Sequence, residues 1–395
     1  MKRPAGKPVF FTKKAGIRER RSCMELELYI HIPFCVRKCN YCDFLSFPGK
    51  EEVIEKYCKA LEKEMEASAT DIPVKSIFIG GGTPSLLLPG QILSLFSCLR
   101  KHFCIRKEAE ISIEANPGTL NEEKLLAFRE AGINRLSIGL QSTDDECLRR
   151  LGRIHTRKQF EENYELARKT GFTNINIDLM SGLPGQTVSG YKDTLDIVTG
   201  LEPEHISSYS LILEEGTPFY ESDKIREMLP EEETEREMYE ITKEILGKKG
   251  YERYEISNYA KKGRECVHNL GYWDGVPYLG LGLGASSFYQ GARFSNENNL
   301  QKYLENPYIP FSNRGDYFVP DQKELMEDYM IFGMRKMWGV SVSEFEKRFG
   351  KTMETVYGDV IQRYLNMGLL ALGKDRLKLT DAGIDVSNRI FEDFL

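Results

Sequence analysis

Short β-rich segments alternate with longer amphipathic segments through the first two-thirds of the 395-residue chain. Six strands are expected, at Leu26–His31, Ser76–Gly80, Ile111–Glu114, Arg135–Gly139, Asn174–Leu179 and His205–Leu211. Helical patterns lie between them, for example at Val53–Ala67, Ile92–His102, Glu122–Ala131, Lys158–Thr170 and Ser189–Thr199. This alternation predicts an α/β fold with a parallel sheet and helices on its outer face. Six such units favour a partial (β/α)6 barrel over the closed eight-unit barrel.

Residues suited to ligand binding or catalysis follow the expected strands. Ligands of parallel α/β folds bind where the strands end. Five strand ends carry such residues: His31, the run Gly80–Pro84, the segment Glu114–Pro117, Gln141 and Asp178. The agreement between five strand ends predicts a single site at the carboxyl edge of the sheet. His31 is expected to shape the loop that follows the first strand.

Three cysteines, Cys35, Cys39 and Cys42, have the spacing C-x3-C-x2-C directly after the first strand. Three thiolates on one loop can bind three irons of a [4Fe–4S] cluster and leave the fourth iron open. The alternative is a structural zinc site, but such sites usually pair two C-x2-4-C motifs, and no second pair lies nearby. Nine cysteines in a chain of this length do not form a disulfide scaffold, which favours a reducing cytoplasm.

The overall charge and the N-terminus narrow the possible partners. A formal net charge of −6 gives no general attraction to nucleic acid or anionic lipid. No apolar run is long enough to span a bilayer. Residues 1–23 are basic and lack the apolar segment of a secretory signal, so a disordered extension is expected. There are two alternatives to a disordered extension. One is a spurious upstream translation start, with Met24 as the true first residue, and the other is a basic tag that contacts the membrane surface.

The chain changes character towards its C-terminus, which predicts a barrel with its extension over residues 24–300 and a second module over residues 310–395. Helices are expected at Lys323–Met337, Val342–Phe349, Thr355–Met367 and Ala382–Phe394, with a hairpin formed by Leu369–Leu372 and Arg376–Leu379. Helices followed by a two-strand wing resemble a winged-helix module. Because no helix is densely basic, a structural or partner-binding role is favoured over nucleic-acid binding.

The cysteine loop, the glycine run and the segment Tyr29–Cys35 resemble the radical S-adenosylmethionine superfamily, in its HemN and HemW branch. The resemblance extends from Met24 to Leu395 and implies a TIM-like radical SAM barrel that binds S-adenosylmethionine. The cofactor contacts that it implies are Tyr29, Tyr41, Gly81, Gly82, Thr83, Glu114, Gln141, Arg153 and Asp178. The plainer readings are a strand-to-helix turn for the glycines and an internal ion pair for Arg153.

Two features separate an enzyme from a heme carrier within this branch. Phe44 stands where the coproporphyrinogen dehydrogenase carries a fourth cysteine, and His268–Trp273 matches the H-N-x-x-Y-W pattern of the HemW type. The resemblance therefore implies a heme chaperone with His268 at the heme iron, an apo-hemoprotein acceptor that can be membrane-bound, and an iron-storage heme donor. If the segment is extended, Cys266 lies on the same side as His268.

Other readings of the same features remain open. His268 could cap a turn with its aromatic neighbours in the core. The protein could be the oxygen-independent coproporphyrinogen III dehydrogenase, or could act on another tetrapyrrole, for example by opening the heme ring. The residues do not decide whether radical chemistry is used in turnover, so enzyme activity stays an open question.

Overall fold

The computed structural model describes residues 25–395. The expectations for the basic extension at residues 1–23 lie outside the described residues. Within residues 25–395, no helix is both long and apolar enough to cross a bilayer.

A twelve-stranded sheet forms the centre of the molecule, in the order β14-β13-β12-β11-β1-β4-β5-β6-β7-β8-β10-β9. The six predicted strands are confirmed as β1 (Leu26–Ile32), β4 (Thr70–Gly81), β5 (Phe103–Ala115), β6 (Arg135–Gln141), β7 (Ile175–Ser181) and β8 (His205–Ser210). They pair in parallel, with Leu28 opposite Ile77 and Ile113 opposite Leu136. The predicted partial barrel is therefore correct.

The sheet extends beyond these six strands on both sides. β11 (Tyr278–Leu281) pairs in parallel with the free edge of β1, with Leu28 opposite Leu279. Antiparallel strands then continue both edges: β12 (Ser286–Tyr289), β13 (Ala292–Ser295) and β14 (Gly315–Phe318) on one side, β10 (Asn258–Ala260) and β9 (Glu252–Arg253) on the other. β1 thus lies inside the sheet, with a parallel neighbour on each side.

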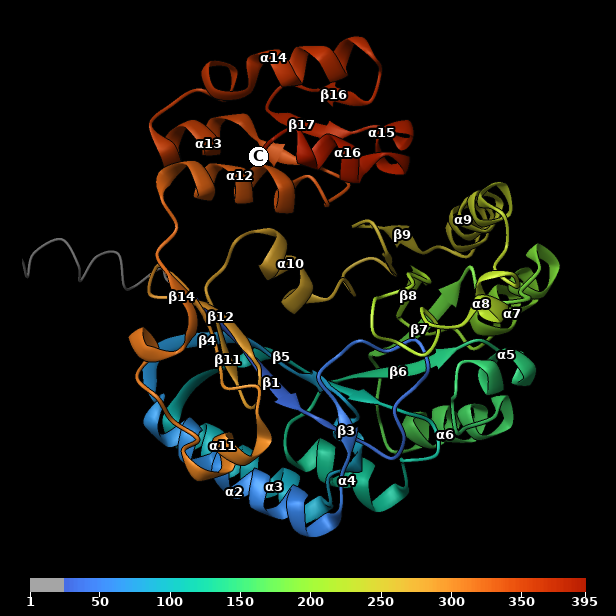
Figure 1. The fold of residues 1–395 in the computed structure, drawn as a ribbon, viewed down its shortest axis with the longest axis vertical. Coiled ribbons are helices and arrows are strands. Elements are labelled where there is room, and N and C mark those ends of the chain that lie inside the picture. Colours follow the sequence, from blue (N-terminus) through green and yellow to red (C-terminus); the bar gives the residue numbers. More distant parts are fainter. Residues whose placement is uncertain (1–24) are drawn as a thin grey trace, which may run out of the picture.

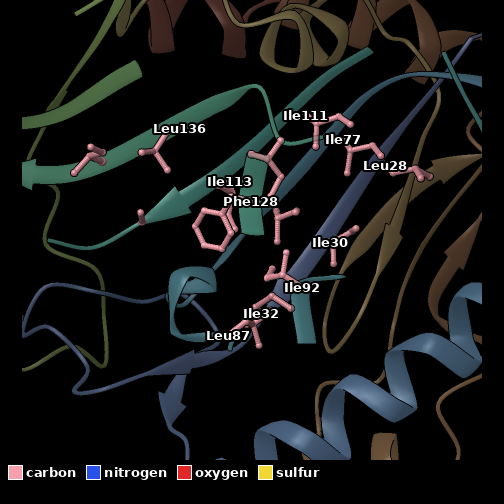
Figure 2. Packing of buried hydrophobic residues seen from close by; sticks show 14 of the residues in the cluster. Leu28, Ile30, Ile32, Ile77, Leu87, Ile92, Ile111, Ile113, Phe128 and Leu136 are labelled. Atoms are coloured by element: carbon pink, nitrogen blue, oxygen red, sulfur yellow. The ribbon is translucent and has the colours of Figure 1, made fainter. Parts of the chain in front are cut away.

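Helices cover the outer face of the sheet (Figure 1). They are α2 (Glu51–Ala67), α3 (Pro89–His102), α4 (Glu122–Glu130), α5 (Asp145–Arg150), α6 (Arg157–Lys169), α7 (Val188–Gly200) and α9 (Glu232–Lys248). Alternate strand residues such as Ile30, Ile77 and Ile113 pack with Ile92 and Phe128 of the helices, as Figure 2 shows. Because side chains of a strand alternate between faces, the intervening residues point into the barrel.

The C-terminal module has a core of its own, formed by side chains such as Met330, Phe345, Leu377 and Ile390. Its elements are α12 (Gln322–Gly333), β15 (Val340–Ser341), α13 (Val342–Phe349), α14 (Met353–Asn366), β16 (Leu370–Leu372), β17 (Arg376–Leu379), α15 (Asp381–Asp385) and α16 (Ser387–Glu392). The predicted hairpin is present, and β15 makes it a three-stranded sheet. The single final helix was wrong, because the chain leaves the helical conformation at Val386.

One short helix lies on the inner side of the sheet. Figure 1 shows α10 (Val267–Trp273) between the barrel and the C-terminal module. Its first residues are held by Glu110 of β5, whose carboxylate accepts hydrogen bonds from the backbone N–H groups of Val267 and His268, at 3.1 and 3.2 Å. This carboxylate complements the positive end of the helix. The helix therefore brings the sequence His268–Trp273 to the mouth of the barrel.

Candidate functional site

The cysteine loop begins where β1 ends. Short strands β2 (Phe34–Cys35) and β3 (Phe47–Pro48) pair with each other and close it at its base. Asn40 anchors the middle of the loop, because its backbone N–H donates to the Leu151 carbonyl at 2.9 Å and its side chain donates to the Arg150 carbonyl at 2.8 Å. Cys35, Cys39 and Cys42 are free thiols, and each is partly exposed. The backbone that carries the three thiols is therefore held in place by strand pairing and hydrogen bonds.

The surroundings of the thiols fit an anionic iron–sulfur cluster. The Thr83 hydroxyl lies 3.5 Å from Cys35 Sγ, and Arg153 Nη1 lies 3.8 Å from Cys39 Sγ. Donors and cations beside a thiolate stabilise its negative charge. Within the described residues, no three His, Cys, Asp or Glu side chains converge as ligands of a single metal ion.

The glycine run at the end of β4 packs closely against the chain that leads into the cysteine loop. Gly82 donates to the Ile32 carbonyl at 2.9 Å, and Thr83 donates to the Phe34 carbonyl at 2.7 Å. A Cβ on Gly81, whose φ is +112°, would lie 2.4 Å from the His31 ring, and one on Gly82 would lie 2.7 Å from the Phe34 backbone. These glycines therefore allow β4 to hold the loop in place, whatever ligand they also contact.

Tyr29 and Glu114 face the interior of the barrel from β1 and β5. The Tyr29 hydroxyl bonds to His31 Nδ1 at 2.9 Å, and His31 Nε2 bonds to the Leu45 carbonyl at 2.9 Å. These bonds tie His31 to the cysteine loop. Glu114 accepts a hydrogen bond from Gly81 N–H at 3.1 Å. Burial and the negative charge of Asp178 raise the pKa of Glu114 to about 7.

Arg153 lies beside the cysteines with its guanidinium held by neutral acceptors. Its Nη2 donates to Asn116 Oδ1 at 2.7 Å and to the Gly139 carbonyl. Asn116 in turn donates to Thr83 Oγ1 at 2.7 Å. The alternative ion pair of Arg153 with an Asp or Glu is not found in residues 25–395. Its buried Nε has no partner, so the guanidinium keeps capacity for a carboxylate ligand.

Asn116 is a site residue that sequence reasoning did not single out. It bridges Arg153 and Thr83, and with them it lines a small cleft beside Cys39. His155 lines the same cleft, and neither of its buried ring nitrogens has a hydrogen-bond partner. Burial, together with the charge of Arg153, lowers the pKa of His155 to about 3. Asn116 directly follows β5, so the strand-end pattern contained a signal for it, whereas His155 had none.

Asp178 lies on the inner face of β7. It accepts hydrogen bonds from Ser137 Oγ at 3.0 Å and from Asn176 Nδ2 at 2.8 Å, and burial raises its pKa. A cavity of about 230 Å³ opens beside it, which we call the interior cavity. Its lining includes Tyr29, Glu114, Arg135, Asp178, His268 and Tyr272. Four of the predicted site residues therefore meet in one space.

Tyr41 and Gln141, like Gly81, Gly82, Thr83 and Arg153, are not among the residues that line the interior cavity. Tyr41 packs in a separate apolar cluster with Leu151 and Phe219, with 6.5 Å between the Tyr41 and Phe219 rings. Gln141 ends β6 in the left-handed region, with φ of +69°, where a non-glycine residue is uncommon. Such a conformation persists when the surroundings enforce it, and it turns the chain after β6.

His268 is buried in α10 with both ring nitrogens occupied. Nδ1 bonds to Ser76 Oγ at 2.9 Å, and Nε2 bonds to the Tyr272 hydroxyl at 3.1 Å. The ring stacks on Phe78, with 5.3 Å between centroids. Burial, with the nearby charges of Lys75 and Arg135, lowers the pKa of His268 to about 3, so the imidazole is neutral. A metal at Nε2 must therefore displace the Tyr272 hydroxyl.

The expectation of an extended segment from Cys266 to His268 was wrong. Cys266 is the N-cap of α10, and its fully buried thiol donates to Glu110 Oε1 at 3.4 Å. Helical geometry from Val267 onward is possible because Glu110 satisfies the first N–H groups of the helix. Burial raises the pKa of the Cys266 thiol, so this group is a poor candidate for a thiolate ligand.

Two further cavities meet the end of α10. The loop cavity, of about 530 Å³, reaches from Tyr272 and Trp273 to Phe44 and Leu45 of the cysteine loop. The module cavity, of about 460 Å³, lies between α10 and the C-terminal module. Tyr272 lines the interior, loop and module cavities alike. Helix α10 therefore stands at the junction of the three.

Comparisons with known proteins agree with this architecture. Residues 29–198 match the radical SAM superfamily, and residues 321–386 match the HemN C-terminal domain. The heme chaperone HemW of Bacillus subtilis is 38% identical, over 93% of this chain and 98% of the relative. That of Lactococcus lactis is 36% identical, over 93% and 96%. This chain belongs to the HemW family.

A solved structure supports the same placement. Coproporphyrinogen III oxidase (HemN) from Escherichia coli, described as a radical SAM enzyme, superposes with a TM-score of 0.83 at 25% identity, over 94% of this chain and 90% of that one. Membership of the HemW family places the chain in the radical SAM superfamily, which implies a [4Fe–4S] cluster and S-adenosylmethionine. The HemN C-terminal match falls within the C-terminal module.

Proposed function

We propose that this protein is a heme chaperone that binds heme and transfers it to an apo-hemoprotein. The observation that carries the proposal is the position of α10, where Tyr272 joins three cavities between the barrel, the cysteine loop and the C-terminal module. Relatives that carry the name heme chaperone HemW cover nearly the whole chain. A space lined largely by aromatic rings suits a flat macrocycle.

The barrel residues supply the cofactor site in this proposal. Cys35, Cys39 and Cys42 hold the [4Fe–4S] cluster. S-adenosylmethionine is held by Tyr29, Tyr41, Gly81, Gly82, Thr83, Glu114, Gln141, Arg153 and Asp178. When bound, the reduced cluster supplies one electron for cleavage of a sulfonium C–S bond. Arg153 offers its guanidinium to a carboxylate, and Asp178 and Glu114 offer acceptors for hydroxyl or amino groups.

His268 is the proposed ligand of heme iron. Its low pKa keeps the ring neutral, and a neutral imidazole is the form that binds iron. Its Nε2 is reached only when the Tyr272 hydroxyl moves away. In this proposal heme therefore binds to His268 only after the Tyr272 side chain has rearranged.

We also propose the setting in which transfer takes place. The partly exposed free thiols of the cysteine loop suit a reducing cytoplasm, with peripheral contact to a membrane where the acceptor is membrane-bound. An iron-storage protein is the proposed heme donor. We assign the cofactor site and its extension to residues 24–300 and a partner-binding role to residues 310–395.

Anaerobic heme titration followed by absorption tests the proposal on cluster-reconstituted wild type, His268→Ala and Tyr272→Phe. The control is His102→Ala on the outer helix α3. We expect saturable binding by wild type and control, weaker binding with an altered spectrum for His268→Ala, and undiminished binding for Tyr272→Phe, which frees Nε2. No saturable binding by wild type would refute the chaperone. An unchanged His268→Ala spectrum would refute only the assigned iron ligand.

The second candidate is the coproporphyrinogen III dehydrogenase, favoured by the similarity to HemN. Against it, Phe44 stands in the cysteine loop and is 63% exposed, where the dehydrogenase pattern has a fourth cysteine. Chromatography of a reduced reaction supplied with S-adenosylmethionine and coproporphyrinogen III separates the two. A vinyl-bearing product would establish the dehydrogenase, and a degraded heme in a parallel reaction would establish ring opening.

A further inference from the structure

The module cavity is walled by aromatic rings from two parts of the fold. Tyr272 and Tyr278 come from the barrel side, with 4.7 Å between their ring centroids. Trp273 faces Phe332 of the C-terminal module at 6.4 Å. Tyr329 of α12 completes the wall on the module side. Such a space suits a flat, apolar ring system better than an extended or highly charged ligand.

The module cavity and the loop cavity are adjacent spaces. Tyr272, Trp273, Tyr278 and Phe332 line both of them. The two cavities are therefore neighbours along one aromatic wall between Phe44 of the cysteine loop and the C-terminal module, and we refer to them together as the joined cavities. At about 530 and 460 Å³, each part is in the size range of ligand pockets, and together they suit a large planar ligand.

Four cationic side chains line the module cavity, and two of them already have carboxylate partners. Arg293 of β13 pairs with Asp328 of α12 at 2.5 Å. Lys336, only 6% exposed, pairs with Asp274 at the end of α10. Both pairs connect the barrel to the C-terminal module. They hold the two sides of the cavity together and are not free to receive a ligand.

The other two cations, Arg348 of α13 and Arg376 of β17, have no carboxylate within ion-pair distance among residues 25–395. The Arg348 guanidinium lies 5.9 Å from the centroid of the Tyr329 ring, and Arg376 Nη1 donates to the Gly339 carbonyl at 3.4 Å. The carboxylate of Glu344, which lies on the same side of the cavity, pairs with Lys347 at 3.3 Å. Two unpaired guanidiniums therefore stand at one end of an aromatic space.

We propose that the joined loop and module cavities hold the heme, with the macrocycle against the aromatic wall and its two propionates on Arg348 and Arg376. This inference rests on the proposed function and deepens it. An arginine fork matches a carboxylate in geometry and charge, and a dicarboxylate needs two such forks. The C-terminal module is then part of the cargo site. His268 lines only the interior cavity, so iron ligation by His268 requires Tyr272, which lines all three cavities and bonds to His268 Nε2, to move aside.

The test compares heme with its dimethyl ester, in which both propionates are blocked. Affinity for each is measured anaerobically in the cluster-loaded full chain for wild type and for Arg348→Gln with Arg376→Gln. Because each charge-assisted contact contributes about tenfold in affinity, the double variant is expected to bind heme at least about tenfold more weakly. The ester is expected to bind wild type and variant equally, and about as weakly as heme binds the variant.

The matched control is Arg363→Gln with Arg389→Gln, which removes the same charge from the same module away from the cavity. Its heme affinity is expected to equal that of wild type, and Arg348→Lys with Arg376→Lys is expected to recover part of the loss. Heme binding by the glutamine variant equal to wild type, or an equal loss with the ester, would overturn the inference while leaving the chaperone intact. No saturable binding by wild type would overturn both.

Discussion

Glu27 is a buried carboxyl group whose protonation state is linked to folding. It lies on the inner face of β1, fully buried, 3.4 Å from Lys75 Nζ, and neither carboxyl oxygen has a hydrogen-bond partner. Burial raises the pKa of Glu27 to about 8, in spite of the charge of Lys75. The folded protein therefore binds a proton that the unfolded chain releases above about pH 4.5.

The sign of the pH dependence follows from that raised pKa. As pH rises from about 5 to 8, Glu27 lowers the free energy of unfolding by up to about 1.4 kcal/mol per pH unit, and the loss levels off above pH 8. Glu27→Gln is expected to remove this slope, so the free energy of unfolding of the variant increases relative to that of wild type as pH rises. Urea unfolding at pH 5 to 9 measures this pH dependence, and Glu66→Gln, at an exposed position, serves as control. Parallel curves for wild type and Glu27→Gln would contradict the linkage.

Arg153 permits a prediction about S-adenosylmethionine. Replacement by Lys keeps the charge but loses the fork that reaches Asn116 and, in the proposed site, the carboxylate of S-adenosylmethionine. We expect Arg153→Lys to bind S-adenosylmethionine at least about tenfold more weakly, while iron and acid-labile sulfide stay at the wild-type level. Equilibrium dialysis and metal analysis give the two readouts. Zinc without sulfide in wild type would instead establish the structural zinc site.

The site residues that the sequence could predict are those tied to a motif or a strand end. The spacing of Cys35, Cys39 and Cys42 and the polar ends of the strands required no knowledge of tertiary contacts. His155 acquires its place only through the tertiary packing of the cleft beside Cys39. His268 also depends on a partner that is distant in sequence, because Ser76 is 192 residues away in the chain. Such partners leave no local pattern.

At the scale of elements, α10 decides how the barrel meets the C-terminal module. Its seven residues include Gly271 and several β-branched or aromatic residues, so its intrinsic helix propensity is low. The helix exists because Glu110 satisfies its first N–H groups and its inner face packs against β1 and β4. This is the physical reason that sequence periodicity did not predict it, whereas the amphipathic outer helices were predicted.

Gly271 tests the packing of α10. A Cβ at this position would lie 1.8 Å from Glu27 Oε1, so Gly271→Ala must displace either the helix or the buried carboxyl. We expect a loss of about 1–3 kcal/mol in the free energy of unfolding, together with weaker heme binding. The control is Gly247→Ala in α9, where a Cβ meets no atom within 4 Å and a small gain in stability is expected. Equal stability of the two variants would refute the tight contact.

At the scale of the whole molecule, the two parts of the chain are joined by ion pairs that differ in burial. In the Lys336–Asp274 pair the lysine is buried and the aspartate is about half exposed, whereas both members of the Lys243–Asp381 pair, at 2.6 Å, are exposed. Removal of Asp274 leaves the buried ammonium of Lys336 without its carboxylate partner, whereas an exposed pair contributes little. The Lys336–Asp274 pair therefore contributes more to the stability of the contact between the two parts of the chain.

Asp274→Asn is accordingly expected to lower the free energy of unfolding by about 1–3 kcal/mol, and Asp381→Asn by less than about 1 kcal/mol. Thermal unfolding at low and high salt measures both. The effect of Asp381→Asn is expected to vanish at high salt, while that of Asp274→Asn persists. A salt-sensitive loss for Asp274→Asn would show that its pair is as exposed as the other.

The position of β1 has a consequence for the order in which the chain is completed. β1 supplies the start of the cysteine loop, and its two neighbours are β4, ending at residue 81, and β11, ending at residue 281. During synthesis, one edge of β1 stays open until some 250 further residues have left the ribosome. An unpaired edge is prone to pairing with other chains. The strand that carries the cysteine loop is thus made long before its second neighbour, so nascent chains are most vulnerable to aggregation and thiol oxidation in that interval.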